Sequence, residues 1–202
     1  MYKPLIAVIG GVPGMGKTSI SGYIARNLGI DIVLSSDYLR EFIRPFSEKI
    51  DGGLIETSVY DAWKFFGEMN SDNIIKGYLK QSAIINEGMN RVISRAAGNG
   101  EDLIIETLYF VPSQMDVPGS VNAKICYIYA EDEFIHRKRL EERENYTHKN
   151  SSGKRLSAHL FEYRAIMDYT VGECRKYGIK TFDNSDYDRT RNDILEYMKE
   201  ND

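Results

Sequence analysis

The stretch Leu5-Ile-Ala-Val-Ile-Gly-Gly-Val-Pro-Gly-Met-Gly-Lys-Thr18 decides the fold. From Gly11 to Thr18 it fits G-x-x-x-x-G-K-[ST], the P-loop pattern whose backbone N–H groups wrap nucleotide phosphates. The apolar run before it predicts a buried parallel strand, and residues 18–28 predict a helix that ends at Gly29. Strand, glycine-rich turn and helix N-terminus together direct N–H groups and a helix dipole at one anion. The context favours a nucleotide site over a chance match.

Two side chains of this motif have definite expected roles. Lys17 is expected to reach the β- and γ-phosphates, and the Thr18 hydroxyl is expected to ligate Mg²⁺. The neighbouring glycines allow the backbone turns and the close approach of phosphate. The residues predicted to bind the nucleotide are Gly11, Gly14, Met15, Gly16, Lys17, Thr18 and Ser19.

The composition is that of an ordinary globular protein. The 202 residues favour a single domain, 1–202, and the formal net charge of −4 speaks against a nucleic-acid partner. No apolar run approaches the roughly 20 residues of a membrane span, and no signal peptide is recognisable, so we expect a cytoplasmic protein without membrane contact. Cys126 and Cys174 lie on apolar stretches and are expected to be buried, reduced thiols. The sequence does not indicate an oligomeric state.

Strands and helices alternate along the chain, which predicts an α/β fold with a parallel sheet. In such a sheet ligands bind in the crevice at the carboxyl ends of the strands. The expected strands cover residues 5–9, 31–35, 103–106, 124–130 and 179–182. The expected helices cover residues 18–28, 37–44, 72–97, 133–143, 156–174 and 189–199, with an irregular or short-helical segment at 45–71.

A polar cluster follows the second expected strand. Asp37, Arg40 and Arg44 are spaced i, i+3, i+7 and share one face of a short helix. Arginine suits binding of a carboxylate or phosphate because its planar fork bonds in a bidentate manner, and Asp37 could accept the proton of a substrate hydroxyl. The alternative is a helix cap with a surface ion pair.

Glu106 ends the third expected strand, Leu103-Ile104-Ile105. A carboxylate at this place is typical of a Walker B residue, which helps to hold Mg²⁺ or its water shell. The alternative is a solvent-facing strand end. Asp37 and Glu106 compete for the role of general base, and the sequence leaves this choice open.

Cations surround a polar stretch at residues 145–154. Arg139 and Arg143 lie four residues apart on the helix before it and are candidate catalytic residues. We predict a mobile lid over about 143–156 that excludes water from the transferring phosphoryl group. The other cations of this group are Arg137, Lys149, Lys154 and Arg155. The alternative is a solvated helix with pairs such as Lys138–Glu142.

Aromatic residues mark a possible acceptor side. Tyr60, Trp63, Phe65 and Phe66 follow closely on one another, and such a patch more often seals a core than binds a ligand. Trp63 and, more weakly, Tyr109 are candidates for contact with the substrate. The predicted substrate-binding insertion covers about residues 37–71.

The motif Gly10 to Ser19, followed by Ser35 to Glu41, Tyr60 to Lys64 and Ile104 to Glu106, resembles the 2-phosphoglycerate kinase group of P-loop small-molecule kinases. The match runs in order from residue 8 to about 112. The resemblance implies a P-loop kinase-like three-layer fold with a five-stranded parallel core sheet and a lid. It also implies ATP with Mg²⁺ as phosphoryl donor, and a phosphorylated small carboxylic acid as acceptor.

The sequence departs from that group in two respects. The first strand begins at residue 5, so the N-terminal regulatory domain of many members is expected to be absent, and Thr107 replaces the usual glycine after the acid. Short single-domain archaeal kinases of mevalonate 3-phosphate are similar in architecture, so this acid is the favoured acceptor and 2-phosphoglycerate the alternative. Arg40 and Arg44 would serve either acid.

Other classes of function are weaker. A regulatory GTPase would need an Asn-Lys-x-Asp motif, which the sequence lacks. An RNA-directed kinase conflicts with the acidic net charge. A non-catalytic nucleotide-binding module conflicts with the intact Lys17, Thr18, Asp37 and Glu106.

Overall fold

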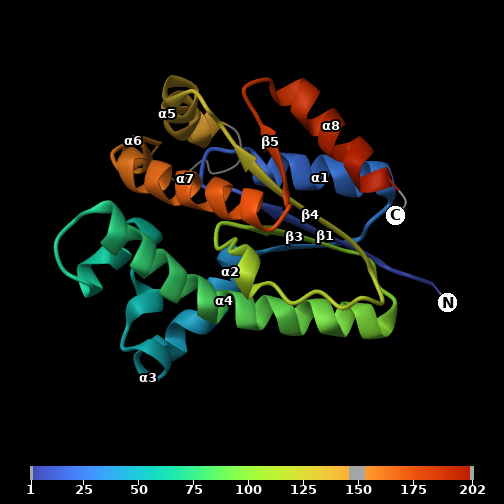
Figure 1. Cartoon of the computed structure of the whole chain (residues 1–202), viewed down its shortest axis with the longest axis horizontal. Helices are drawn as coiled ribbons and strands as arrows, with labels where there is room; N and C mark the ends of the chain where they lie inside the picture. The colour runs from blue at the N-terminus through green and yellow to red at the C-terminus, as the bar shows by residue number, and fades with distance from the viewer. Residues whose placement is uncertain (1, 146–152, 201–202) are drawn as a thin grey trace.

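A computed structural model describes residues 2–145 and 153–200 of the chain (Figure 1). Its centre is a five-stranded sheet in the order β2-β3-β1-β4-β5, in which every pairing is parallel. The strands are β1 (Leu5–Gly10), β2 (Ile32–Ser35), β3 (Leu103–Thr107), β4 (Asn122–Tyr129) and β5 (Lys180–Asp183). The predicted α/β fold with a five-stranded parallel sheet is therefore confirmed.

The central strands are buried because helices cover both faces of the sheet. Every residue of β3 is buried, and Ile104 and Ile105 are fully enclosed. Each such side chain contributes about 1.5–3 kcal/mol of hydrophobic stabilisation relative to exposure. Continuous apolar runs rather than alternating patterns are expected in strands of this kind, which is why the sequence predicts them well.

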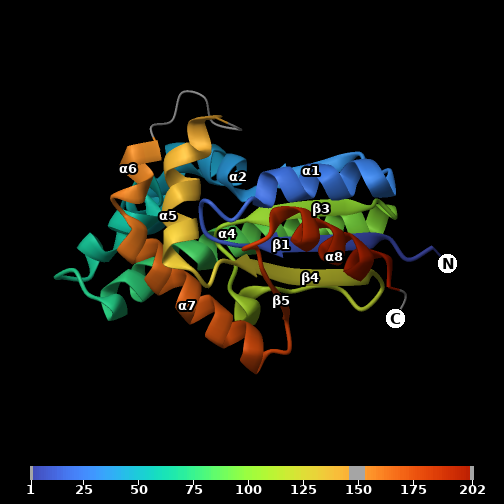
Figure 2. The same ribbon diagram turned by 90° about the horizontal axis from the view of Figure 1, so that it is seen from above.

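Two pairs of helices make the outer layers (Figures 1 and 2). Helices α1 (Lys17–Leu28) and α8 (Tyr187–Lys199) pack on each other, as do α4 (Ser71–Asn99) and α7 (Leu160–Lys176). The long α4 begins where the Asn70 side chain accepts a hydrogen bond from the Asn73 N–H, and it ends at Gly100 in the left-handed conformation. Both chain ends lie at the edge of the molecule away from α5 and α6 (Figure 1).

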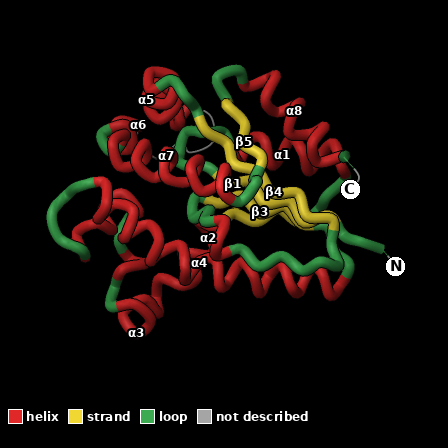
Figure 3. Tube along the Cα trace, viewed as in Figure 1, coloured by secondary structure: helices red, strands yellow, loops and turns green. Residues whose placement is uncertain are grey.

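The segment after β2 forms short helices beside the N-terminal part of α4 (Figure 3). They are α2 (Ser36–Ile43), η1 (Arg44–Phe46), α3 (Ser47–Asp51), η2 (Leu54–Glu56) and η3 (Val59–Phe65). This agrees with the short-helical character predicted for residues 45–71. A further short helix, η4 (Pro112–Gln114), follows β3.

The single helix predicted for residues 156–174 is wrong, because the structure divides it into α6 (Gly153–Ser157) and α7. His159 precedes α7 with φ −105° and ψ 25°, which is not helical. Upstream lie α5 (Glu133–Glu141) and η5 (Glu142–Asn145), and α6 packs on α5. A Cβ atom at Gly153 would collide with the Glu141 carbonyl oxygen, so only glycine permits this contact.

The central part of the predicted lid, residues 146–152, lies outside the described residues, and Lys149 lies there with it. Within the described ranges, no helix has the length and apolar character needed to cross a membrane. Cys126 and Cys174 are both free and buried, as predicted.

Candidate active site

The loop between β1 and α1 has the geometry of an anion cradle. Gly16 precedes α1 at φ 78°, a left-handed conformation that a side chain would strain. A Cβ atom there would also lie 3.2 Å from Nδ2 of Asn184. Lys17 curls back over the loop, and its Nζ donates to the Val12 carbonyl oxygen at 3.2 Å. The loop backbone thus stays open to a ligand at the start of the helix.

A pocket of about 430 Å³ opens in front of this loop, within the usual range for small-molecule sites. Its wall is made by Pro13, Gly14, Gly16, Lys17, Thr18, Ser19, Arg139, Glu142, Arg143, Asn184 and Tyr187. Seven of the predicted site residues therefore converge here, five from the loop and two from the helix after β4. The pocket lies where the strands end, as the parallel sheet requires.

Asn184 and Tyr187 line the pocket but were not predicted from the sequence. Asn184 is fully buried, its Nδ2 donates to the Met15 carbonyl oxygen at 2.9 Å, and its Oδ1 has no hydrogen-bond partner among the residues that the structure describes. It directly follows β5, and Tyr187 begins α8. The rule that functional side chains follow the ends of parallel strands could have identified both.

Thr18 and Glu106 meet at the edge of this pocket. The Thr18 hydroxyl donates to the Glu106 carboxylate, with Oγ1 at 2.8 Å and 3.0 Å from the two oxygens. Glu106 is only 6% exposed and sits at the end of β3, opposite Ile9 of β1. These hard oxygen donors suit Mg²⁺, which typically takes one or two protein oxygens and completes its shell with phosphates and water.

Lys17 lies in a field of mixed charges. Burial lowers the pKa of its amine, the carboxylates of Glu106 and Asp37 raise it, and Arg143 lowers it. The pKa of Lys17 therefore depends on the charges of two carboxylates and one arginine. The site therefore gathers the cations that a transferring phosphoryl group needs and the acids that a metal ion or a hydroxyl proton needs.

Asp37 stands at the beginning of α2, where Ser35 caps the helix by accepting from the Asp37 N–H at 3.3 Å. The Asp37 side chain is exposed. The next residue back, Ser36, is buried, and its Oγ accepts from the Leu108 N–H just after β3. This contact fixes the start of α2 beside Glu106, so both candidate bases lie at the same edge of the sheet.

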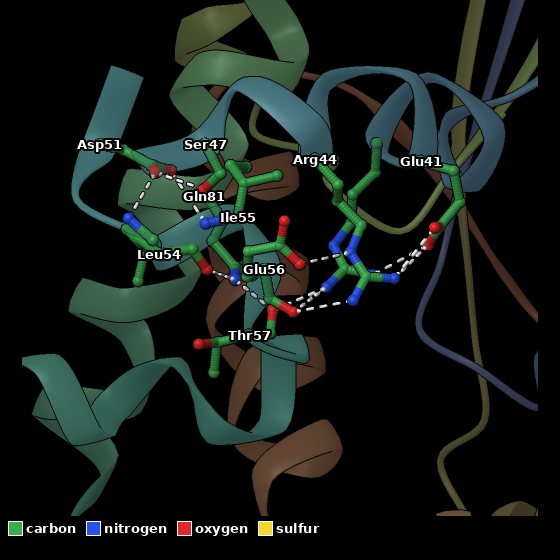
Figure 4. Close-up of polar contacts among 11 residues, drawn as sticks. Glu41, Arg44, Ser47, Asp51, Leu54, Ile55, Glu56, Thr57 and Gln81 are labelled. Carbon is green, nitrogen blue, oxygen red and sulfur yellow. Dashed lines mark hydrogen bonds and ion pairs between the residues drawn. The ribbon is translucent and has the colours of Figure 1, made fainter. Parts of the chain in front are cut away.

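Arg40 and Arg44 are engaged with the protein itself (Figure 4). Nη2 of Arg40 donates to the carbonyl oxygens of Thr57 at 2.8 Å and Glu56 at 3.2 Å. Arg44 pairs with Glu41 at 2.9 Å and with Glu56 at 3.2 Å, and these carboxylates raise its pKa. Both arginines therefore hold the segment 54–57, a role that the sequence did not indicate. Their direct contact with an acceptor stays a prediction.

Gln81 holds the same segment from α4 (Figure 4). It is fully buried, and its Nε2 donates to the carbonyl oxygens of Leu54 and Thr57, each at 2.8 Å. The Thr57 carbonyl oxygen thus accepts from Arg40 and Gln81 at once. No motif of the sequence points to this glutamine, because its partners are backbone atoms far along the chain.

Trp63 and Tyr109 occupy different environments. Trp63 is partly buried against the core, and its indole N–H has no hydrogen-bond partner within residues 2–145 and 153–200. Tyr109 is 1% exposed, and burial raises the pKa of its phenol, while the charges of Arg40 and Asp37 act on it in opposite directions. Tyr109 is therefore a buried residue that the charges of the predicted acceptor residues reach, and it does not belong to the pocket wall.

Helix α5 ties the pocket to the P-loop through His136. Its Nε2 lies 2.9 Å from the Pro13 carbonyl oxygen, and the side chain is fully buried. Burial lowers the pKa of His136 to about 4, so the ring is neutral and donates through Nε2. One turn later Arg139 contributes to the pocket wall, and burial lowers its pKa as well.

Arg143 lies beyond Arg139, in η5 directly after α5. Burial lowers the pKa of its guanidinium, and the negative charges of Asp37 and Glu106 act against this. Among the predicted lid cations that the structure describes, Arg139 and Arg143 line the pocket. Other predicted site residues lie around it without forming its wall: Gly11, Met15, Asp37, Arg40, Arg44, Trp63, Glu106 and Tyr109.

Comparisons with known proteins agree with this architecture. The profile of a protein family described as an AAA domain matches residues 10–152. Among solved structures, shikimate kinase from Acinetobacter baumannii has a TM-score of 0.51 at 14% identity, covering 96% of this chain and 89% of that one. A gluconokinase from Sinorhizobium meliloti has a TM-score of 0.52 at 19% identity, covering 98% and 92%. These two structures support the fold.

Two curated relatives are similar in sequence along almost the whole chain. Mevalonate-3-phosphate 5-kinase of Thermoplasma acidophilum is 60% identical over 191 residues, covering 95% of this chain and 94% of that protein. The 2-phosphoglycerate kinase of Pyrococcus horikoshii is 31% identical over 197 residues, covering 97% of this chain and 64% of that protein.

The fold, the P-loop pocket and these likenesses define the class of the protein as a P-loop kinase, an ATP-dependent phosphotransferase. Within this class, the chain belongs to the family that contains mevalonate-3-phosphate 5-kinase and the 2-phosphoglycerate kinases.

Proposed function

We propose that this kinase transfers the γ-phosphoryl group of ATP to the 5-hydroxyl of mevalonate 3-phosphate and so forms mevalonate 3,5-bisphosphate. The observation that carries the proposal is the 60% identity to mevalonate-3-phosphate 5-kinase over nearly the full length of both chains. The pocket geometry supports it, because a P-loop and several cations converge beside an exposed carboxylate at the strand ends.

On the donor side, the loop from Gly11 to Ser19 binds the phosphates of ATP, and Lys17 neutralises their charge. Arg139 and Arg143 complete the cationic wall and stabilise the transferring group. Thr18 and Glu106 would hold Mg²⁺ through their oxygens. When bound, this ion neutralises charge on the β- and γ-phosphates.

On the acceptor side, residues 37–71 form the substrate-binding part of a single domain. Asp37 acts as the general base because it is exposed, whereas the Glu106 carboxylate already accepts from Thr18. Asp37 accepts the proton of the acceptor hydroxyl as the oxygen attacks phosphorus. Arg40, Arg44, Trp63 and Tyr109 support this side of the site.

The second candidate acceptor is 2-phosphoglycerate, which the 31% identity to a 2-phosphoglycerate kinase favours. It shares a carboxylate, a phosphate and a free hydroxyl with mevalonate 3-phosphate. The residues proposed here would meet the same groups in either acid.

An assay that couples ADP formation to a spectroscopic signal tests the proposal against mevalonate 3-phosphate, mevalonate and 2-phosphoglycerate. We expect turnover with mevalonate 3-phosphate and a second phosphomonoester in the ³¹P spectrum of the product. Turnover with 2-phosphoglycerate alone would establish the second candidate. ADP formation that does not depend on any of the three acids would contradict both.

A further inference from the structure

Four side chains form a connected group where the segment after β2 meets α6 and α7. The Tyr60 ring of η3 lies flat on the His159 imidazole, with ring centres 3.8 Å apart and planes 13° apart. His159 Nδ1 lies 3.0 Å from an oxygen of Glu162, which is only 5% exposed. The Tyr60 hydroxyl accepts from Nη1 of Arg155 at 3.1 Å.

This arrangement fixes Tyr60 and, through it, Arg155. The Tyr60 ring is 7% exposed, with His159 against its face and Tyr163 at its edge, 6.0 Å away and nearly perpendicular. Arg155, by contrast, lies on the exposed side of the short helix α6. A long side chain at such a position samples many rotamers, and one bond to a rigid hydroxyl removes much of that freedom.

Arg155 is close to the active-site cations. Helix α6, which carries Arg155, packs on η5, which carries Arg143. Burial lowers the pKa of Arg143, and the positive charge of Arg155 adds to this. Burial raises the pKa of Tyr163, and the charges of both arginines act against this rise. Arg143 lines the pocket in front of the P-loop, and the negative charges of Asp37 and Glu106 raise its pKa against the effect of burial. Two guanidinium groups held near each other repel, and an anion that bonds to both relieves this repulsion. A phosphate group, with its charge of about −1.5 to −2, fits two arginines better than a carboxylate does.

We propose that Arg155, together with Arg143, binds the phosphate group that the acceptor already carries, and that Tyr60 is the positioning residue of Arg155. His159 and Glu162 hold the Tyr60 ring in its orientation. This inference rests on the proposed function, because it assigns one group of that acceptor to one pair of residues. The hydrogen bond between Tyr60 and Arg155 also connects the segment 37–71 to the active site through α6, in addition to its connection through α2.

The decisive experiment is a double-mutant cycle with Tyr60→Phe, which removes only the hydroxyl, and Arg155→Ala. Arg155→Ala should lower kcat/KM for mevalonate 3-phosphate by roughly 10–100-fold, the usual range for a lost hydrogen bond to a charged group. Tyr60→Phe should raise the KM for the acceptor by about fivefold, while kcat and the KM for ATP stay within about twofold.

The cycle separates positioning from a general structural role. If Tyr60 acts through Arg155, then Tyr60→Phe has no further effect on the acceptor KM in the Arg155→Ala background. An undiminished effect in that background would overturn the positioning role. Tyr177→Phe, which changes an exposed tyrosine just after α7, is the matched control and should leave all kinetic constants unchanged. Thermal melts check that every variant is folded.

Calorimetric binding distinguishes the phosphate from the carboxylate of the acceptor. Mevalonate 3-phosphate and mevalonate share the carboxylate but differ in the phosphate, so the ratio of their Kd values isolates the phosphate contact. We expect Arg155→Ala to reduce this ratio by about tenfold or more. Equal weakening of both ligands would overturn the assignment to phosphate.

Failure of this inference is distinguishable from failure of the proposed function. If the wild-type enzyme acts on 2-phosphoglycerate instead, the proposed acceptor is wrong, yet the same cycle on that acid should show the same loss at Arg155. If the wild-type enzyme acts on mevalonate 3-phosphate and Arg155→Ala leaves its KM and Kd unchanged, the phosphate site is wrong and the proposed function stands.

Discussion

The two sides of the active site are built in different ways. The core of the donor side is one continuous stretch, because β1, the P-loop and the start of α1 follow each other within residues 5–19. Later parts of the chain complete it with Glu106, Arg139, Arg143 and Asn184. The acceptor side is held together by side chains that bind distant backbone. Arg40 on α2 and Gln81 on α4 both donate to the Thr57 carbonyl oxygen between them.

This difference has a physical consequence. The donor loop owes its shape to backbone conformation, so its tolerance to substitution is set by residues such as Gly16 at φ 78°. The segment 54–57 owes its place to hydrogen bonds to buried donors, each of which contributes only about 0.5–1.5 kcal/mol. The acceptor side should therefore be held in place less strongly than the donor loop. Substitutions there should change the affinity for the acceptor before they change kcat.

The largest expected effect lies on the donor side. Lys17→Ala should lower kcat by about 10³–10⁵-fold, because it removes a cation beside the transferring phosphoryl group. The fold should persist, since in the described part of the chain the Nζ of Lys17 donates to the carbonyl oxygen of Val12 within its own loop. Steady-state kinetics and circular dichroism check this together. Near-normal turnover would show that the pocket is not the donor site.

Asp37→Asn tests the boundary between the two sides. Loss of the general base should lower kcat by roughly 10²–10⁴-fold, and the KM for ATP should stay unchanged. Glu106→Gln provides the comparison, because it alters the proposed metal ligand and should raise the Mg²⁺ concentration needed for half-maximal rate. A change in acceptor KM alone in Asp37→Asn would make Asp37 a binding residue and leave the base to Glu106.

The same contrast explains how far the sequence could predict the molecule. The strands and the P-loop were predictable because apolar runs and glycine spacing act locally. Arg139 and Arg143, four residues apart in the sequence, both line the pocket, and their catalytic role stays a prediction. The break between α6 and α7 was not predictable, because the apolar residues Leu156 and Leu160 keep helical spacing across it although the backbone at His159 is not helical.

Arg40 and Arg44 show the limit most clearly. Their spacing on α2 predicts a shared face, and the structure places both at the segment 54–57. What they bind there is backbone and acid side chains, and the partner residues Glu56 and Thr57 carry no motif. The contact of Asn184 with Met15 was not predicted for a similar reason, since it joins residues 169 positions apart in the sequence.

His136 connects α5 to the P-loop through the Pro13 carbonyl oxygen. Its lowered pKa makes the free energy of unfolding of the protein depend on pH. Its pKa is about 4 in the folded protein and about 6.5 in the unfolded chain, so the unfolded chain binds the extra proton between these values. The contribution to the free energy of unfolding is fully present above about pH 6.5. It is lost as the pH falls toward 4, by about 3 kcal/mol in total.

His136→Gln should remove this pH dependence while its amide still donates to the Pro13 carbonyl oxygen. Urea unfolding of both proteins at pH 7 and pH 4.5 measures the difference, and all other titrating groups are common to the two. We expect the wild type to lose about 2–3 kcal/mol more than the variant between these pH values. Parallel losses would mean that the imidazole is protonated in the folded protein.

The smallest expected effect tests the acceptor side directly. Arg40→Lys removes the planar fork that reaches the carbonyl oxygens of Glu56 and Thr57, and it should raise the acceptor KM by about tenfold without changing the KM for ATP.

Gln81→Met tells whether Arg40→Lys raises the acceptor KM by loosening the segment 54–57 or by removing a contact with the acceptor. Gln81 donates to the same Thr57 oxygen, and as a fully buried residue of α4 it is not among the predicted acceptor residues. A similar rise in acceptor KM in Gln81→Met means that Arg40 works by holding the segment. An unchanged KM in Gln81→Met, with the rise confined to Arg40→Lys, means that Arg40 contacts the acceptor itself. Acceptor binding then depends on Arg40 directly rather than on the hydrogen bonds that hold the segment 54–57.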